Sequence, residues 1–424
     1  MKKVLAELIT IGDEILYGQT LDTNGHWMSG ALDKIGVKVV RRTTCGDEED
    51  EMLQAFSQAE QRADIILITG GLGPTSDDLT KPCLAKYFDC DIVMNEQALS
   101  ELEAYMTSRG RKLNTLTRLQ AALPEKCEMI SNERGTACGM WFNKTGSPAG
   151  EARKVFISMP GVPHEMKFMM KEKIIPRLEQ EFELPIIYHK IVRLAGIGES
   201  WLAEKIKDWE KSLPQHVKLA YLPTFGDLKL RLTAQGINKE KIKSQIDQLI
   251  QDLLPLVQEY MYGYDDDSLE FVIGELLKKQ NKKLALAESC TGGYVSHRIT
   301  SIPGSSAYFN GAIVAYQDEV KINHLNISSD TIEKYGAVSE KTVTEMAINV
   351  KQKYNADYGL ASSGIAGPGG GTVEKPVGLI WIACARGNDV ETKKLNLTKD
   401  RDVNIQIASV ALLTLLYKIL IKNN

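Results

Sequence analysis

The stretch Ala287–Lys321, AESCTGGYVSHRITSIPGSSAYFNGAIVAYQDEVK, decides the architecture of the C-terminal part of the chain. The apolar run Lys283–Ala287 is typical of a buried strand, and a helical pattern runs from Tyr294 until Pro303–Gly304 stop it. Between strand and helix stand the N-cap candidates Ser289–Thr291 and two glycines. This order predicts a strand-turn-helix unit. Either the turn is simply well capped, or its hydroxyls and free N–H groups face a ligand.

A serine and a lysine further along the same stretch suggest nucleophilic chemistry. Lys321 follows a strand-like pattern over 311–320 and lies 15 residues after Ser306, a separation that a turn and a strand can bridge. A partly desolvated lysine can take the proton of a serine hydroxyl, and glycine-rich turns can supply N–H groups for an oxyanion. A lysine considered alone is more often solvated at the surface, so the pair is a hypothesis.

A second glycine-rich loop, 363–378, follows the apolar run Tyr358–Ser362. Two glycine-rich loops at strand ends predict one shared crevice. That crevice would contain hydroxyls, Lys321 and an arginine, but neither of the nearby histidines, and the sequence has no G-x-S-x-G. A Ser-His-Asp triad is therefore not supported, whereas a serine–lysine arrangement is.

The N-terminal part alternates strand and helix patterns at the spacing of βαβ units. Apolar runs at 3–11, 37–40 and 65–69 predict strands. A helix capped at Asp22 and another from about Asp47 fill the intervals. The pattern predicts a doubly wound sheet with parallel strands.

The segment Gly70–Thr80, GGLGPTSDDLT, stands at the end of the third predicted strand. Glycines that lead from a strand into a helix are a usual cradle for phosphate, and Asp77 and Asp78 could hold a divalent cation beside it. The loop is neither G-x-G-x-x-G nor a P-loop, so a glycine turn with two helix-stabilising aspartates is the alternative. The run Ile157–Met166 repeats the strand-turn-helix design, with His164 as either a ligand contact or a helix cap.

Residues 176–262 differ in character and predict a small α+β piece. They contain 12 Lys and Arg against 12 Asp and Glu, so no excess of basic charge favours nucleic acid there. We interpret the segment as a structural spacer, followed by a linker at Tyr262–Asp267.

Length and composition indicate a cytoplasmic α/β protein of two or three domains. The chain has 424 residues, of which 43% are hydrophobic and 25% are charged, and a net charge of −4. No apolar run reaches about 18 residues, so we expect no membrane span. Seven cysteines at irregular spacings, without C-x-x-C, predict reduced thiols instead of disulfides or a zinc site.

Four N-terminal motifs carry a family resemblance. GDEIL at 12–16, DTN at 22–24, GGLGPTSDD at 70–78 and MPGVPHEM at 159–166 resemble the N-terminal domain of the competence/damage-inducible CinA family, which is similar to molybdopterin-binding proteins. The resemblance implies hydrolysis of ADP-ribose with a divalent metal, Mg²⁺, Mn²⁺ or Co²⁺. The implied nucleotide and metal site consists of Gly71, Gly73 and Thr75 together with the metal ligands Asp13, Asp77 and Asp78. Cys138 departs from the proline that the family usually has there.

The C-terminal motifs AESCTGG, GSSAYFNGAIVAY, Lys321, GAVSE, SGIAGPGGG and KPVG, over about 268–422, resemble the nicotinamide mononucleotide amidohydrolase (deamidase) domain of the same family. The resemblance implies hydrolysis of the carboxamide to nicotinate mononucleotide and ammonia, by a serine–lysine mechanism without a cofactor. The implied roles are Ser306 as nucleophile, Lys321 as general base, Tyr316 as a helper in proton transfer, Ser289 as a supporting hydroxyl and Arg401 as the phosphate ligand. The implied substrate contacts are Thr291, Gly292, Gly293, Ser363 and Gly364. Whether Ser306 or Ser289 is the nucleophile stays open, and Gln317–Asp318 replace the family's usual Ser-Asn.

The whole chain is thus predicted to contain two α/β three-layer domains with mostly parallel sheets, at 1–172 and 263–424. A small α+β domain at 173–262, K-homology-like by the resemblance, joins them. The resemblance also implies a homodimer at least. Three functional interpretations remain: a bifunctional hydrolase, an amidohydrolase whose N-terminal domain only binds a nucleotide or pterin, and an accessory protein of DNA uptake. Charge balance argues against the third, so we expect small-molecule nucleotides as partners, and neither nucleic acid nor membrane.

Overall fold

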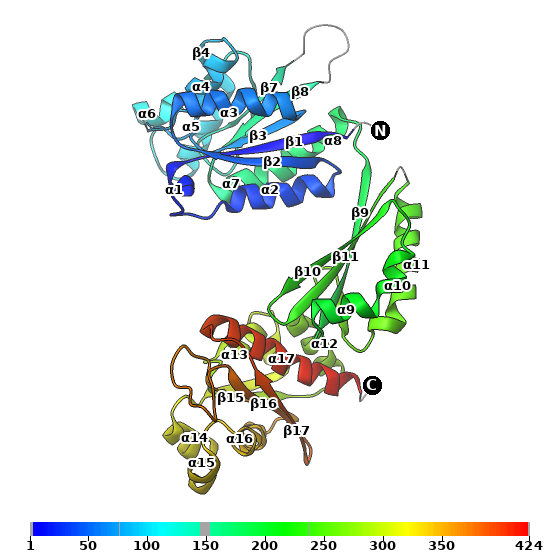
Figure 1. The fold of residues 1–424 in the computed structure, drawn as a ribbon. Helices are drawn as coiled ribbons and strands as arrows, with labels where there is room; N and C mark the ends of the chain where they lie inside the picture. The colour runs from blue at the N-terminus through cyan, green and yellow to red at the C-terminus, as the bar shows by residue number, and fades with distance from the viewer. Residues whose placement is uncertain (1–2, 76, 145–152, 237, 423–424) are drawn as a thin grey trace. The chain divides into compact units, whose positions relative to one another are not determined.

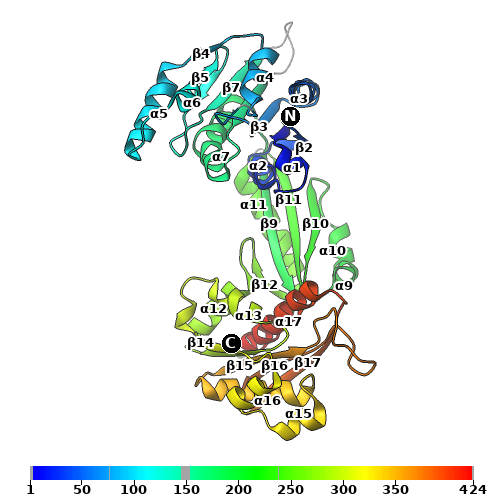
Figure 2. The ribbon, with the colours of Figure 1, turned by 90° about the vertical axis from the view of Figure 1, so that its left-hand side faces the viewer.

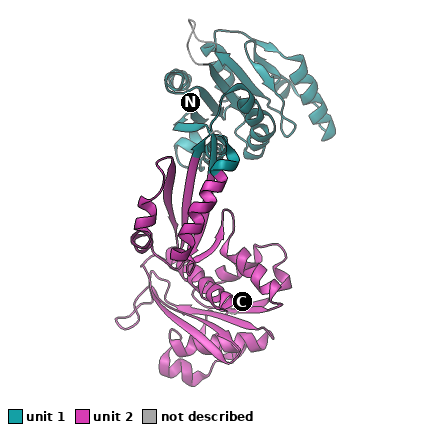
Figure 3. Ribbon diagram, turned by 90° about the vertical axis from the view of Figure 1, so that its right-hand side faces the viewer, with its two compact units in different colours: residues 1–188, 235–242 teal, residues 189–234, 243–424 magenta. Residues whose placement is uncertain are grey.

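A computed structural model describes residues 3–75, 77–144, 153–236 and 238–422. The chain divides into two compact units, residues 1–188 with 235–242 and residues 189–234 with 243–424 (Figure 3).

A six-stranded sheet with the order β2-β1-β3-β8-β7-β6 organises the first unit (Figure 1). Its strands are β1 (Leu5–Ile11), β2 (Lys38–Cys45), β3 (Ile65–Thr69), β6 (Glu128–Ile130), β7 (Gly139–Lys144) and β8 (Lys154–Met159). The first three and β8 run parallel, while β7 is antiparallel to both of its neighbours. A short antiparallel pair, β4 (Ile92–Met94) and β5 (Ala122–Pro124), stands apart from it.

Helices cover both faces of this sheet because its strands alternate between two apolar cores. Ala6 and Leu8 of β1 face one core, and Ile9 and Ile11 face the other. The first face carries α2 (Thr23–Lys34), α7 (Pro163–Met169), a π-helical turn (Met170–Ile174) and α8 (Ile175–Glu181). The second face carries α3 (Glu49–Arg62), α4 (Thr80–Tyr87) and α5 (Glu96–Ser108); two short helices, α1 (Asp13–Leu16) and α6 (Thr115–Leu119), complete the domain. This is the predicted three-layer α/β architecture.

The middle of the chain forms a four-stranded sheet with the order β10-β11-β9-β12. Its elements are β9 (Ile186–Ala195), α9 (Glu199–Lys205), α10 (Lys207–Lys211), β10 (Val217–Thr224), β11 (Asp227–Gly236), α11 (Lys239–Val257) and β12 (Met261–Tyr264). The predicted linker at Tyr262–Asp267 is therefore partly wrong. Its first residues belong to β12, which adds to the sheet by antiparallel pairing with β9.

The C-terminal domain contains a five-stranded sheet with the order β14-β13-β15-β16-β17. The strands are β13 (Leu284–Glu288), β14 (Phe309–Val314), β15 (Tyr358–Gly364), β16 (Leu379–Arg386) and β17 (Asp389–Asn396). β13 pairs in parallel with β14 and β15, and β16 and β17 continue the sheet antiparallel.

Leucines and alanines alternate along β13 and set the spacing of the two helical layers. Leu284 and Leu286 face the core beneath α12 (Leu269–Lys279), α13 (Tyr294–Thr300) and α17 (Arg401–Ile421). Ala285 and Ala287 face the opposite core, which α16 (Glu340–Lys353) covers closely. Two further helices, α14 (Asp318–Leu325) and α15 (Ser329–Tyr335), lie with α16 on that side, and Figure 2 shows both layers.

α17 is long and apolar enough to cross a membrane by length and composition, and it is the one such helix among the described residues. However, 56% of its apolar window is buried. It packs against α12, α13 and β16 as the central core helix of its domain.

The predicted helix start at Asp22 is confirmed, since its side chain accepts a hydrogen bond from the N–H group of Gly25. Ser268 and Ser339 cap α12 and α16 in the same way. The strand predicted to lead up to Lys321 is wrong beyond Val314. The chain turns there, and Lys321 lies inside helix α14.

Candidate functional sites

The first candidate site lies where the parallel strands β13, β14 and β15 of the C-terminal sheet end. Ser289 is the first residue after β13, is buried, and donates its backbone N–H to Ser362 O of β15 (3.0 Å). Ala315, just past β14, donates its N–H to Glu288 O (2.7 Å). The carboxyl ends of three strands are therefore tied together around the turn that contains Ser289.

Glu288, at the end of β13, holds that turn from inside. Its side chain is fully buried and accepts hydrogen bonds from the N–H groups of Gly293 (3.0 Å), Val295 (3.1 Å) and Ser296 (2.8 Å). The hydroxyls of Thr291 and Ser296 also donate to it. A carboxylate in this position satisfies the free N–H groups that begin α13. The start of α13 is thus already filled by an anion of the chain itself.

The residues of this turn, Ser289–Gly293, were predicted to cap the helix or to contact a substrate, and the structure gives them different contacts. The cap of α13 is the Glu288 side chain, not a hydroxyl of Ser289–Thr291, because none of those side chains reaches the helix N–H groups. Thr291, predicted to bind substrate, is buried, and its hydroxyl lies 2.7 Å from both Glu288 Oε2 and Ser362 Oγ. Gly292 and Gly293 have φ values of 61° and 95°, which turn the chain back into the helix.

Lys321 is almost completely buried, with 1% of its surface exposed. Its Nζ donates to Tyr316 O (3.3 Å) and to Asp318 Oδ1 (3.2 Å). Because Tyr316 directly follows the residue that is tied to Glu288 O, this amine lies at the same edge of the sheet as Ser289. The alternative of a solvated surface lysine is wrong.

Arg401 and Tyr316 form the outer part of this edge. Arg401, the first residue of α17, donates Nη2–H to the hydroxyl of Tyr316 (2.7 Å) and Nη1–H to Gly367 O of the second glycine-rich loop (2.8 Å). Tyr316 is 52% exposed. A guanidinium that leaves further N–H donors for a ligand therefore links the two glycine-rich segments.

The two predicted contacts on β15 are structural in this arrangement. Ser363 is buried, and its hydroxyl donates to Ala337 O (2.6 Å), which fixes the GAVSE segment against the sheet. At Gly364 a Cβ atom would come within 2.5 Å of Ile380 Cγ1, so the glycine allows β16 to approach closely.

The predicted pairing of Ser306 with Lys321 is wrong in this structure. Ser306 lies on a 3₁₀ turn, Ser305–Ala307, that enters β14, and it is exposed. Lys321 follows the other end of that strand. Phe309 pairs with Leu284 at the start of β13, whereas Val314 pairs with Glu288 at its end. Five residues of extended chain span about 17 Å, so the two side chains stand at opposite edges of the sheet.

The second candidate site is a cavity of about 410 Å³ in the N-terminal domain. It lies at the carboxyl ends of the parallel strands β1, β3 and β8, where the segments Ile11–Gly12, Thr69–Gly73 and Pro160–Gly161 line it. Crevices of parallel sheets bind ligands at this edge. The cavity falls within the volume range of small-molecule sites.

The glycine-rich loop after β3 is fixed by close packing against β1 and by hydrogen bonds to Asp78. Gly70 has a φ of 111°, and a Cβ atom there would come within 2.1 Å of Ile11 O. Asp78 accepts hydrogen bonds from the N–H groups of Gly73 (2.8 Å) and Thr75 (3.0 Å), so these predicted nucleotide contacts are used within the loop itself. Gly71, which lines the cavity, stays open to a ligand.

Carboxylates gather on one side of this cavity, though not as the sequence predicted. Glu14, Asp47, Asp77 and Asp78 line it, whereas the Asp13 carboxylate lies against Gly46 outside it. Among the described residues no group of three His, Cys, Asp or Glu is assembled to hold a metal, so the predicted trio Asp13, Asp77 and Asp78 is wrong as a preformed site.

A divalent cation nevertheless fits this side. Burial raises the pKa of Asp47, and the negative charges of Asp13, Glu14 and Asp77 raise that pKa further, against the lowering effect of the Asp13 N–H donor. Carboxylates that repel one another in this way are relieved by a cation. Hard oxygen donors suit Mg²⁺, which commonly takes only one or two carboxylates and completes its shell with phosphate and water.

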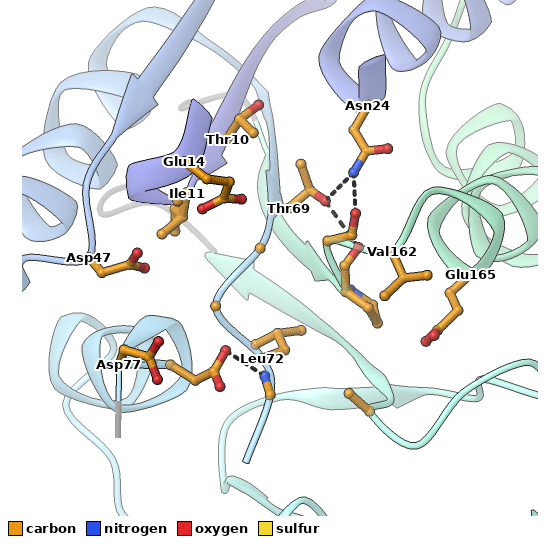
Figure 4. A pocket seen from close by; sticks show the side chains of 18 of the residues that line it. Thr10, Ile11, Glu14, Asn24, Asp47, Thr69, Leu72, Asp77, Val162 and Glu165 are labelled. Carbon is orange, nitrogen blue, oxygen red and sulfur yellow. Dashed lines mark hydrogen bonds between the residues drawn. The ribbon is translucent and has the colours of Figure 1, made fainter. Parts of the chain in front are cut away.

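A further polar group lies across the cavity. Figure 4 shows Asp47 and Asp77 on one side and Asn24, Val162 and Glu165 on the other. Glu165 is 9% exposed, and Asn132 Nδ2 donates to its Oε2 (2.6 Å). Burial raises the pKa of Glu165. His164, the residue considered from the sequence, is exposed and does not line the cavity.

Three family models match the chain in order. The "Probable molybdopterin binding domain" covers residues 7–180, the "Damage-inducible protein CinA KH domain" residues 189–263 and the "CinA C-terminal domain" residues 266–420. A CinA-like protein of Cytophaga hutchinsonii is 48% identical over 412 residues, which are 97% of each chain. The chain belongs to the CinA family.

Other CinA proteins agree with this assignment. A CinA-like protein of Flavobacterium psychrophilum is 40% identical over 420 residues, 99% of each chain. The crystal structure of CinA from Thermoplasma acidophilum is 34% identical and covers 42% of this chain and 98% of its own, with a TM-score of 0.36. The family models and the two relatives that match nearly the whole chain confirm the predicted family and fold class, including the K-homology-like domain in the middle.

Sequence reasoning missed four CinA residues that shape the two sites: Glu14, Asp47, Glu165 and Glu288. The signal for Glu288 was a charged residue at the end of the apolar run LALAE, directly before the serine turn. Glu165 had a weaker signal, because a glutamate in the first turn of a helix is usual at any helix start.

Proposed function

We propose that the C-terminal domain hydrolyses the carboxamide of nicotinamide mononucleotide to nicotinate mononucleotide and ammonia, with Ser289 as the nucleophile and Lys321 as the general base. The observation that carries this proposal is that Ser289, the buried Lys321 and the Tyr316–Arg401 pair all stand at the same edge of the sheet. Ser306 is not proposed again, because it lies at the opposite edge.

In the proposed acylation, Ser289 Oγ bonds to the carboxamide carbon while its proton moves to Lys321 Nζ. The tetrahedral intermediate then breaks its C–N bond, and the leaving nitrogen takes that proton to depart as ammonia. The N–H of Thr291, for which the described residues offer no acceptor, is a candidate donor to the oxyanion. An ester on Ser289 remains.

In the proposed deacylation, a water molecule attacks the ester carbon and gives a proton to Lys321. The C–O bond to Ser289 breaks, the serine oxygen recovers a proton from Lys321, and nicotinate mononucleotide leaves. Arg401 would hold the phosphate of the nucleotide through its remaining N–H donors, and Tyr316 would orient Arg401.

Product analysis tests this function. The full chain incubated with nicotinamide mononucleotide should release ammonia and nicotinate mononucleotide in equal amounts, and Lys321→Met should lower the rate by about 10²–10⁴-fold, as expected for loss of a general base. Lys341→Met, at an exposed position of α16, is the matched control. Unchanged ammonia release by Lys321→Met would reject the mechanism.

For the N-terminal domain we propose hydrolysis of the pyrophosphate of ADP-ribose with a divalent metal, Mg²⁺, Mn²⁺ or Co²⁺. The open glycine-rich loop and the facing carboxylates support this proposal. One or two of the carboxylates of Glu14, Asp47 and Asp77 would hold the cation together with oxygens of the ligand and water, and the cation when bound would neutralise phosphate charge and lower the pKa of bound water. Gly71 and neighbouring N–H groups would hold the phosphates in place.

Formation of AMP from ADP-ribose tests the second activity. The wild-type chain should form AMP with at least one of the three metals, and Asp47→Asn should not. If ADP-ribose binds without forming AMP, the alternative of a nucleotide- or pterin-binding domain stands instead. A homodimer and a cytoplasmic location remain predictions.

A further inference from the structure

The N-terminal cavity has a second polar side that pyrophosphate cleavage leaves unused. Glu14, Asp47 and Asp77 lie on one side, and Figure 4 shows Asn24, Val162 and Glu165 on the other, with Thr69 and Leu72 between them. A ligand whose phosphates meet the glycine-rich loop and the three carboxylates would therefore extend another part toward Glu165.

One oxygen of the Glu165 carboxylate accepts a hydrogen bond, and the other accepts none from the described residues. Oε2 accepts a hydrogen bond from Asn132 Nδ2 (2.6 Å), and the same amide group donates to Ala137 O (2.8 Å). Oε1 accepts no hydrogen bond from the described residues. Burial raises the pKa of Glu165 and the charges of His164 and Arg109 act against that rise from a distance, but neither of these side chains forms an ion pair with it. One acceptor oxygen is therefore left for a ligand.

The surrounding chain is built to hold this side chain. A Cβ atom on Gly135 would come within 1.8 Å of Glu165 Oε2, so only glycine leaves room for the carboxylate. Asn24 Nδ2 donates to Gly161 O (2.7 Å) and Thr69 Oγ1 donates to Pro160 O (3.1 Å), which fixes the turn that begins α7. Glu165 is thus presented by a rigid turn, as residues of specific binding sites are.

The chemistry of this oxygen limits what it can bind. A carboxylate accepts hydrogen bonds and repels phosphate, so the ligand part beside it must carry O–H or N–H donors and no negative charge. Vicinal hydroxyls of a ribose fit this requirement, and an acidic side chain is the usual partner of ribose hydroxyls in dinucleotide sites. Burial raises the pKa of this carboxyl, and donors from a ligand would favour its ionised form.

We propose that Glu165 accepts hydrogen bonds from the vicinal hydroxyls of a ribose adjoining the pyrophosphate, and so makes the N-terminal site selective for ribonucleotides. Asn132, Gly135 and the Asn24–Gly161 contact position it. The proposal rests on the proposed nucleotide function of this domain. The ribose is either that of the adenosine or the distal one of ADP-ribose.

Calorimetric titration of the full chain with Mg²⁺ present separates these two sources. ADP against 2′-deoxy-ADP tests the adenosine ribose, and ADP-ribose against ADP tests the distal one. The wild-type chain should prefer the compound with the additional hydroxyls by about 10-fold or more in one of the two pairs, as a charge-assisted hydrogen bond supplies. Glu165→Gln, which keeps an oxygen for Asn132, should reduce that preference to less than about 3-fold. Glu172→Gln, an exposed position that follows α7, should leave it unchanged.

The outcomes that overturn the proposal are distinct from failure of the pyrophosphatase function. Equal preferences in the wild type and in Glu165→Gln, or no binding of either pair, would reject a ribose role. A change in the ratio of ADP to IDP affinity would show that Glu165 contacts the base. A fall in kcat for AMP formation with unchanged binding ratios would make it a catalytic base. If ADP-ribose binds with the predicted selectivity but is not cleaved, only the pyrophosphatase proposal fails.

Discussion

The two α/β domains place their candidate sites at the same edge of the same kind of sheet, yet with opposite charge arrangements. In the C-terminal domain the Glu288 carboxylate is fully buried and satisfied by donors from the start of α13. That edge also carries the hydroxyl of Ser289, the guanidinium of Arg401 and the amine of Lys321, which pairs with the Asp318 carboxylate. In the N-terminal domain Asp78 accepts hydrogen bonds from N–H groups of its own loop, while Glu14, Asp47 and Asp77 line an open cavity.

The shared fold thus places a binding site at the carboxyl ends of the strands in both domains. The residues at those strand ends then determine whether the site binds a neutral or a negatively charged ligand group. A strand end that carries its own satisfied anion suits a neutral carboxamide and a nucleophilic hydroxyl. A strand end with facing carboxylates requires a cation and suits a phosphate ligand that brings one.

Removal of divalent metal should separate the two activities completely. With EDTA, AMP formation from ADP-ribose should fall by more than about 100-fold, because the carboxylates then have no cation to neutralise. Ammonia release from nicotinamide mononucleotide should stay within about twofold, because Ser289 and Lys321 supply its chemistry. Parallel loss of both activities would contradict the contrast. Restoration by added Mg²⁺, Mn²⁺ or Co²⁺ is the control.

Neutralising the buried Glu288 carboxylate of the C-terminal site should mainly lower the stability of the domain. Glu288→Gln places an amide NH₂ among N–H donors, so the free energy of unfolding of this domain should fall by about 2–3 kcal/mol. Ser296→Ala removes one of the hydroxyl donors and should cost about 1 kcal/mol. Urea titration followed by circular dichroism measures both. A Glu288→Gln domain as stable as the wild type would mean that the carboxylate does not hold the turn.

The architecture of both domains could be predicted because each strand is an apolar run of buried residues with recognisable helix starts after it. The position of Ser306 could not. A sequence separation of 15 residues from Lys321 says nothing about which end of a strand each residue occupies. In the sequence Gln317–Glu319 extend the strand pattern toward Lys321. In the fold they form the start of helix α14, and Lys321 is one of the buried residues of that helix.

The remaining site residues were harder for a different reason. Glu288 and Glu165 act through side chains that turn inward from a strand end and a helix start, where a carboxylate is common and usually solvated. Their partners, such as Asn132 for Glu165, are distant in the sequence. The family motif points to Asp13, but Asp47 lines the cavity and Asp13 does not.

Substitution of Arg401 tests whether the C-terminal site binds the phosphate of the nucleotide. Arg401→Lys keeps the charge but loses the fork of N–H donors, so KM for nicotinamide mononucleotide should rise about 10-fold with a smaller change in kcat. The matched substrate is nicotinamide riboside, which lacks the phosphate, and its low rate should not change. Equal losses for both compounds would show that Arg401 only supports the fold through Gly367 and Tyr316.

The pH dependence of stability should reveal the buried carboxyl of the N-terminal cavity. Because burial raises the pKa of Glu165 in the folded chain, its ionisation opposes folding at neutral pH and has no effect once the group is protonated in both states. Glu165→Gln should therefore raise the free energy of unfolding at pH 7–8, and the gain should disappear as the pH falls below the ordinary pKa of a glutamate, about 4.3. Calorimetric unfolding of both chains at several pH values measures this. A gain that does not vary with pH would contradict the assignment.

The choice of nucleophile tests the C-terminal account most directly, and it needs one assay of ammonia release from nicotinamide mononucleotide with two serine variants. Ser289→Ala should lose activity by about 10³-fold or more, because the attacking oxygen beside Lys321 is removed. Ser306→Ala, at the opposite edge of the sheet, should stay within about twofold of the wild type. An active Ser289→Ala chain together with an inactive Ser306→Ala chain would contradict the account.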